Sequence, residues 1–208
     1  FPTRRSSDLP QTLSLGKKII FALGQLGWSL ASYAPGMLLV YFYLPPDTGT
    51  PVFPQRIHQG AILGILTLIG LAYGAGRLFD AITDPLIAGM SDRCKSPLGR
   101  RRKYLAVSFL PFSLFSLLVF LPPSPGYSVL NSVWVFAGII IFYWFMTMYV
   151  TPYFAMMSEL SHTPNDRLFL STLISITWAL GTAIGSQVYA IKGAFEGMGM
   201  EATQAFQT

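Results

Sequence analysis

The sequence predicts an all-α membrane protein, because its charges are few and its apolar residues form long runs. Of 208 residues, 52% are hydrophobic and only 11% are charged. A soluble domain carries about a quarter charged residues, so these charges are too few to cover its surface. The apolar runs are about 20 residues long, the length at which a helix spans a bilayer. The composition also excludes a disordered chain, with 16 Phe and 10 Tyr, and a disulfide scaffold, with one Cys.

Five apolar segments are expected to be transmembrane helices, over residues 19–44, 60–90, 104–121, 130–151 and 168–191. Pro and Gly punctuate the gaps between them, and Pro152 is expected to end or kink the fourth. A helix over all of the second segment would be about 45 Å long, more than the hydrocarbon core of about 30 Å. We therefore favour immersion of residues 68–89 over immersion from residue 60.

The basic residues predict the orientation of these helices. One side carries Lys17, Lys18, Arg167 and six cations in residues 93–103, whereas the other carries Arg56 and Lys192. Because cytoplasmic loops are enriched in Lys and Arg, the N-terminus is expected on the cytoplasmic side. The membrane is expected to be a bacterial-type inner or plasma membrane. The basic run adjoins the bilayer, so nucleic acid is not an expected partner.

The two ends of the chain suggest a gene fragment. Residues 1–9, FPTRRSSDL, are similar to a translated sequencing adapter and lack the apolar core of a signal peptide. A short basic tail is the alternative. The chain stops after five expected spans, so we expect 10–208 to be a partial N-terminal half whose partner is a missing C-terminal half.

The second segment carries three charges inside an apolar run: Arg77, Asp80 and Asp84. Each costs about 2.5–3.5 kcal/mol in a membrane unless it faces protein or water. Spacings of three and four residues place all three on one helical face, so they form one site. Two carboxylates four residues apart suit Na⁺, and repulsion between them allows a proton to substitute. A structural ion pair between Arg77 and Asp80 is the alternative, and both can hold together.

Three stretches resemble one family: GRLFDAITDPLIAGMSDRCKSPLGRRRKYL at residues 76–105, PYFAMMSELSHTPNDR at 152–167, and the opening LSLGKKIIFALGQLG. They are similar to the glycoside–pentoside–hexuronide:cation symporters, the melibiose-carrier-like branch of the major facilitator superfamily (MFS). The resemblance implies twelve helices in two six-helix halves, alternating access, and helices one to five of the first half in this chain.

The resemblance also implies a site for the coupling cation. Its members are Asp80, Thr83, Asp84 and Thr147, with Arg77 balancing charge. Thr83 stands where melibiose carriers have an asparagine, and a hydroxyl is the weaker ligand, so the ion is left open as Na⁺ or H⁺. No other metal or cofactor is expected. The sequence shows no phosphate-binding glycine loop and no nucleophile–histidine pair, which argues against an enzyme.

Five side chains are candidates to line a substrate path. Gln25, Trp28 and Ser29 lie in the first segment, and Tyr149 and Tyr153 in the fourth. Each has helix packing as its alternative role. The charged galactoside contacts of melibiose carriers have no counterpart, since the acidic residue of their first helix falls at Ser29. The substrate is expected to be a small molecule, either a sugar or a glycoside.

The charged residues at the cytoplasmic ends are expected to form a latch between helices, with membrane orientation as the alternative role. The members are Asp92, Arg93, Arg100, Arg101, Arg102, Glu159 and Arg167.

The predicted function is therefore cation-coupled symport of a sugar or glycoside. A carrier of lysolipids or other amphiphiles is the rival in the same class. A non-transporting membrane scaffold, and a membrane enzyme that uses the two carboxylates, are the rivals from other classes.

Overall fold

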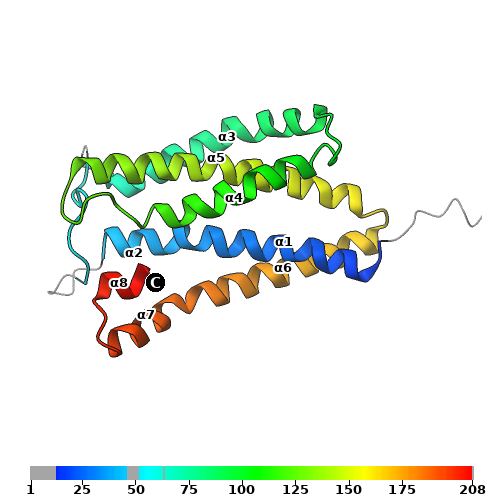
Figure 1. Cartoon of the computed structure of the whole chain (residues 1–208). Helices are drawn as coiled ribbons and strands as arrows, with labels where there is room; N and C mark the ends of the chain where they lie inside the picture. The colour runs from blue at the N-terminus through cyan, green and yellow to red at the C-terminus, as the bar shows by residue number, and fades with distance from the viewer. Residues whose placement is uncertain (1–12, 46–51, 63, 208) are drawn as a thin grey trace, which may run out of the picture.

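The computed structural model describes residues 13–45, 52–62 and 64–207, so the segment 1–9 lies outside the described residues. Within these ranges the chain is helical, and its only extended pairing is an isolated bridge between Ile62 and Leu66. The long helices lie side by side along one axis, with their turns at the two ends (Figure 1). The prediction of an all-α chain is confirmed. The elements are α1 (Leu15–Tyr33), the π-helix η2 (Ala34–Leu38), α2 (Leu39–Tyr43), α3 (Leu68–Arg93), α4 (Arg102–Leu118), α5 (Val129–Leu160), α6 (Pro164–Ser186), α7 (Val188–Gly197) and α8 (Ala202–Gln207).

The helix α3 begins at Leu68, eight residues later than the segment expected from residue 60. Thr67 is its N-cap, because its hydroxyl accepts a 3.2 Å hydrogen bond from the amide of Gly70. Gly64 has a φ of +72°, a left-handed conformation that no helix interior uses. Residues 60–62 and 64–67 are therefore not helical, and the expectation of a helix from residue 60 is wrong.

The helix α5 continues through Pro152 to Leu160, although the sequence suggested an end at residue 151. Its ends are set instead by caps. The Ser128 hydroxyl accepts from the amide of Leu130 at 3.1 Å, and the amide of Ser161 donates to the Met157 carbonyl. A proline removes one amide donor but leaves the rest of a long helix intact. Pro85 and Pro111 likewise lie inside α3 and α4.

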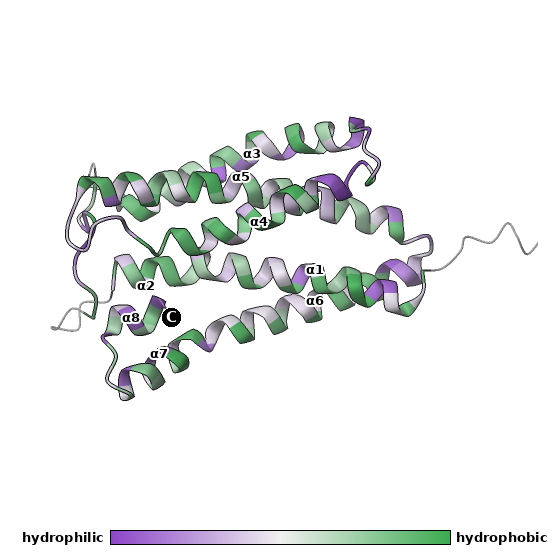
Figure 2. Ribbon diagram, viewed as in Figure 1, coloured by the Kyte–Doolittle hydropathy of each residue, from purple (hydrophilic) through white to green (hydrophobic). Residues whose placement is uncertain are grey.

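The apolar side chains cover the outside of the bundle as well as its interior. Large exposed residues include Leu78, Leu110 and Ile184, and Figure 2 shows hydrophobic colouring along the helices with hydrophilic patches near their ends. Two helical stretches, Val129–Leu160 and Pro164–Gly197, are long and apolar enough to cross a membrane by length and composition. An apolar exterior of this extent is unusual in a water-soluble monomer.

The helices α1 and α6 approach each other closely through two glycines of α6. A Cβ atom at Gly181 would overlap the Ser29 hydroxyl, and one at Gly185 would lie 2.7 Å from the Tyr33 ring. Small residues four apart allow this approach between membrane helices. The pair α1–α6 packs beside a second group, α3, α4 and α5.

Candidate functional site

The candidate cation site lies between α3 and α5, which run in the same direction (Figure 1). The Thr147 hydroxyl donates a 2.7 Å hydrogen bond to Oδ1 of Asp80, and the Thr151 hydroxyl donates a 2.9 Å bond to Oδ1 of Asp84. Within each pair the two residues are 67 positions apart in the sequence. Because parallel helices share the same rise, one offset repeats the same contact at successive turns.

The first pair is sheltered from solvent. The side chain of Asp80 is 13% exposed, and its second oxygen lies 3.7 Å from Nη1 of Arg77. The Arg77 guanidinium is 5.5 Å from the ring centroid of Tyr143, yet its side chain is 73% exposed. The ring of Tyr143 packs against Gly76, where a Cβ atom would collide with it. Arg77 is therefore a loose partner of Asp80 at the edge of the bundle.

The second pair is open. Asp84 is exposed, although a carboxylate in a membrane helix is expected to face protein or water. Together the pairs present two carboxylates and two hydroxyls on neighbouring turns. These are all oxygen donors, which hard cations prefer. The described part of the chain contains no group of three or more His, Cys, Asp or Glu residues that could hold a metal ion.

The structure does not bring the Thr83 hydroxyl to the carboxylates. Thr83 is buried, and its hydroxyl donates 3.4 Å to the backbone carbonyl of Asp80 in its own helix. The threonine hydroxyl beside Asp84 belongs to Thr151, which was not among the residues expected at the site. The available signal was spacing, since Thr147 and Thr151 are four residues apart, as Asp80 and Asp84 are.

The five substrate-lining candidates meet where α1 contacts α5 and α6. The hydroxyls of Tyr149 and Tyr153 donate to the α1 carbonyls of Gly24 and Phe21, at 3.1 and 2.8 Å. Ser29 is buried and bonds the carbonyl of Leu26. These three hydroxyls therefore join helices or satisfy their own helix.

The other two candidates, Gln25 and Trp28, have unused polar atoms. Gln25 is buried, and its Oε1 has no hydrogen-bond partner in the described part of the chain. The same holds for Nε1 of Trp28, whose ring packs between those of Phe154 and Trp178. Buried polar atoms without partners are rare, so these two are the atoms free to meet a polar ligand.

Only some members of the expected latch form ion pairs with one another in the described ranges. Glu159 accepts from Arg100, and its Oε1 lies 3.5 Å from Arg101, which bonds Asp92 at 2.8 Å. Three expected members make no ion pair in the described ranges: Arg93, Arg102 and Arg167.

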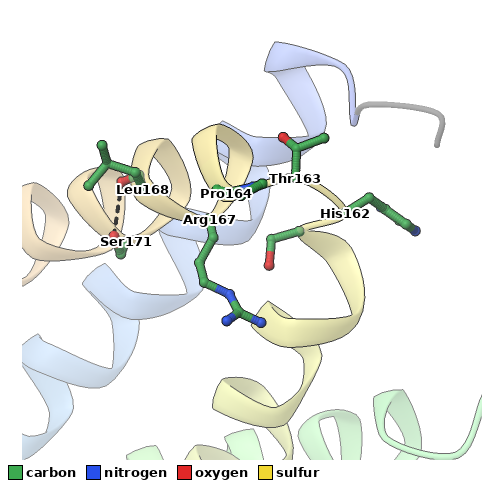
Figure 3. A pocket seen from close by; sticks show the side chains of 7 residues that line it. His162, Thr163, Pro164, Arg167, Leu168 and Ser171 are labelled. Carbon is green, nitrogen blue, oxygen red and sulfur yellow. Dashed lines mark hydrogen bonds between the residues drawn. The ribbon is translucent and has the colours of Figure 1, made fainter. Parts of the chain in front are cut away.

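Arg167 lies apart from that network, in a pocket of about 560 Å³ at the turn between α5 and α6. Figure 3 shows its side chain extending from the first turn of α6, while His162 points away from it. Thr163, Leu168 and Ser171 are among the other lining residues. No carboxylate lines this pocket, which leaves the guanidinium accessible.

An unexpected ion pair joins α1 to the start of α6. Lys18 donates to Oδ1 of Asp166 at 2.5 Å, and both side chains are nearly buried, at 12% and 10% exposure. Asp166 is also in the first helical turn, whose N-cap is Thr163. A carboxylate there is favoured by the helix dipole. From the sequence, Lys18 was expected to contribute to membrane orientation alone.

Comparison with known proteins decides the family. A family model described as MFS/sugar transport protein matches residues 20–208. The chain belongs to this family. It is 29% identical to an uncharacterised symporter of Synechocystis, over 88% of this chain and 32% of that protein. It is 28% identical to a putative glycoside/cation symporter of Escherichia coli, over 74% of this chain and 30% of that protein. It is also 28% identical to the sodium-dependent lysophosphatidylcholine symporter 1 of Xenopus tropicalis, over 94% of this chain and 34% of that protein.

The MFS assignment confirms the resemblance to sugar:cation symporters and makes the chain an integral membrane protein of a transporter family, not an enzyme. The chain spans about one third of the length of these curated relatives.

Proposed function

We propose that this MFS chain forms part of a cation-coupled symporter that moves a sugar or glycoside by alternating access. The observation that carries the proposal is the repeated contact between α3 and α5, which sets Asp80 and Asp84 beside two threonine hydroxyls. Four side chains with oxygen donors, on two parallel helices, are a preorganised site for a small cation.

The ion acts by lowering the free-energy cost of covering the helix face that carries Asp80 and Asp84. Asp84 and Arg77 are exposed here, and charges on a membrane helix are costly against lipid. The relatives are about three times longer than this chain, so in a protein of their length we propose that further helices cover the face. A bound Na⁺ or proton neutralises a carboxylate and favours the covered conformation, which couples the ion to the rocking of the halves.

The sugar assignment is supported by Gln25 and Trp28. The amide oxygen of Gln25 and the indole N–H of Trp28 have no partners among the described residues and can form hydrogen bonds with the hydroxyls of a glycoside. An acyl chain has no group that forms such a hydrogen bond. The name of the Escherichia coli relative points to the same class.

The second candidate is a carrier of lysolipids, favoured by the amphibian relative, which matches 94% of this chain. An uptake assay separates the two. A full-length transporter that carries this sequence is reconstituted in proteoliposomes and offered labelled glycosides or lysophosphatidylcholine under a Na⁺ or a pH gradient. Ion-dependent glycoside uptake that Gln25→Leu reduces supports the sugar carrier. Ion-dependent lysolipid uptake that Gln25→Leu leaves unchanged replaces it with the lysolipid carrier.

A further inference from the structure

The loop between α3 and α4 carries more positive charge than its neighbours neutralise. Residues 93–103 contain six basic side chains and no acid. Two carboxylates, Asp92 and Glu159, contact them, and both bind Arg100 or Arg101. Four positive charges therefore remain, and Arg102 and Lys103 make no ion pair in the described ranges. The enrichment of Lys and Arg in cytoplasmic loops explains such an excess, but it does not require that these residues form a binding pocket.

This loop does form a pocket, of about 420 Å³, against the last turns of α5. Arg100, Arg101 and Arg102 line it together with Glu159, which is already engaged by two of them. Nη1 of Arg101 is buried without a hydrogen-bond partner in the described part of the chain. The guanidinium groups thus retain donors for an additional anion.

The remaining wall of the pocket is apolar. Pro97, Leu98, Met156 and Leu160 line it, and Leu98 is 61% exposed. A small soluble anion has no apolar surface to bury against such a wall. An amphiphile with an anionic head would place its apolar part there.

The apolar lining continues along the seam between α4 and α5. A smaller cavity of about 140 Å³ is lined by Lys103, Tyr104, Val107 and Met148. Met148 and Met156 lie two four-residue steps apart on α5, and Lys103 and Val107 one such step apart on α4, so each pair lies on one side of its helix. The helices α4 and α5 run in opposite directions (Figure 1), and each cavity is lined by residues of both helices. The seam passes from guanidinium groups through Lys103 to apolar side chains.

We propose that this seam, defined by Arg100, Arg101, Arg102, Lys103, Val107 and Met148, binds an anionic phospholipid. The phosphate lies against the arginines and Lys103, and an acyl chain follows Val107 and Met148. Basic pockets between membrane helices at the bilayer surface bind anionic headgroups in this way. The proposal is independent of the transported substrate and of the coupling ion.

The test uses the chain purified in a neutral detergent, with bound lipids counted by native mass spectrometry during titration. Phosphatidylglycerol is expected to bind at least tenfold more tightly than phosphatidylcholine. The double variant Arg102→Gln, Lys103→Gln is expected to weaken phosphatidylglycerol binding on the order of tenfold. Its matched control is Lys17→Gln, Arg167→Gln, which removes two cations outside the seam and is expected to change binding less than twofold. Circular dichroism verifies the helical content of both variants.

Three outcomes overturn the proposal. Equal binding of the two lipids by the unmodified chain excludes an anionic headgroup site without reference to any variant. Equal weakening by the control variant assigns the effect to the total charge of the chain. Displacement of phosphatidylglycerol by glycerol phosphate at similar concentrations makes the pocket a site for soluble anions, because the apolar wall then contributes nothing.

Discussion

The carboxylate of Asp80 accepts a 2.7 Å hydrogen bond from the Thr147 hydroxyl, and the two residues are 67 positions apart. The same separation recurs one helical turn later between Asp84 and Thr151, at 2.9 Å. The site is therefore a property of the register between two parallel helices, and a shift of one residue in either would remove both contacts.

Thr147→Val is expected to weaken Na⁺ binding by about tenfold or more, because it removes an oxygen donor from a charged site. One polar interaction with a charged group contributes about 1.5–3 kcal/mol. Thr147→Ser keeps the hydroxyl and is expected to retain most of the affinity. Isothermal titration of the purified chain with Na⁺ measures both.

Thr83→Val is the matched control for this series, since within the described residues the Thr83 hydroxyl bonds the Asp80 carbonyl of its own helix and no carboxylate. It is expected to change Na⁺ affinity less than twofold. A larger loss for Thr83→Val than for Thr147→Val would assign the cation shell to Thr83 and refute the geometry described above.

Gly181→Ala is expected to destabilise the chain by about 1–3 kcal/mol, because the added methyl overlaps Ser29 between α1 and α6. Thermal unfolding in detergent measures the loss. Gly193→Ala is the control, because beyond its chain neighbours and the backbone of its own helix no described atom lies within 4 Å of the added carbon. Ser29→Gly in the Gly181→Ala background is expected to restore stability, and a failure to do so would place the strain elsewhere.

Lys18→Met is expected to lower the melting temperature of the chain in detergent, because it leaves the Asp166 carboxylate without its partner. Replacing both residues, Lys18→Met with Asp166→Asn, is expected to cost less than the single change, since no unpaired charge remains. Lys17→Met, at an exposed neighbouring position, serves as the control. Equal stability of the Lys18 and Lys17 variants would show that the pair contributes nothing to the α1–α6 contact.

The sequence alone singles out the two carboxylates as candidates, because charge in an apolar helix is costly and its spacing is visible. Asp80 and Asp84 needed no partner helix to be recognised. Thr151 did, because its relation to Asp84 depends on how α3 and α5 are aligned, which no local pattern specifies. Thr83 was chosen by resemblance, and its side chain turns to its own backbone.

The start of α3 was mispredicted for a local reason. Residues 60–67 are apolar enough to continue a membrane helix, but Gly64 adopts a left-handed conformation and Thr67 caps the helix that follows. The contact between Lys18 and Asp166 joins residues 148 positions apart and carried no signal within either segment.

Titration of the purified chain with Na⁺ at two pH values tests whether Asp80 and Asp84 bind the coupling cation. Saturable binding is expected, and it is expected to weaken at the lower pH because protons compete for the carboxylates. It is expected to be lost in both Asp80→Asn and Asp84→Asn. Glu196→Gln, which removes a carboxylate bound to Lys192 far along the chain, should bind Na⁺ as the unmodified chain does. If both Asp variants bind Na⁺ with unchanged affinity, or if the unmodified chain binds neither Na⁺ nor protons at these carboxylates, then Asp80 and Asp84 are not the site of the coupling cation.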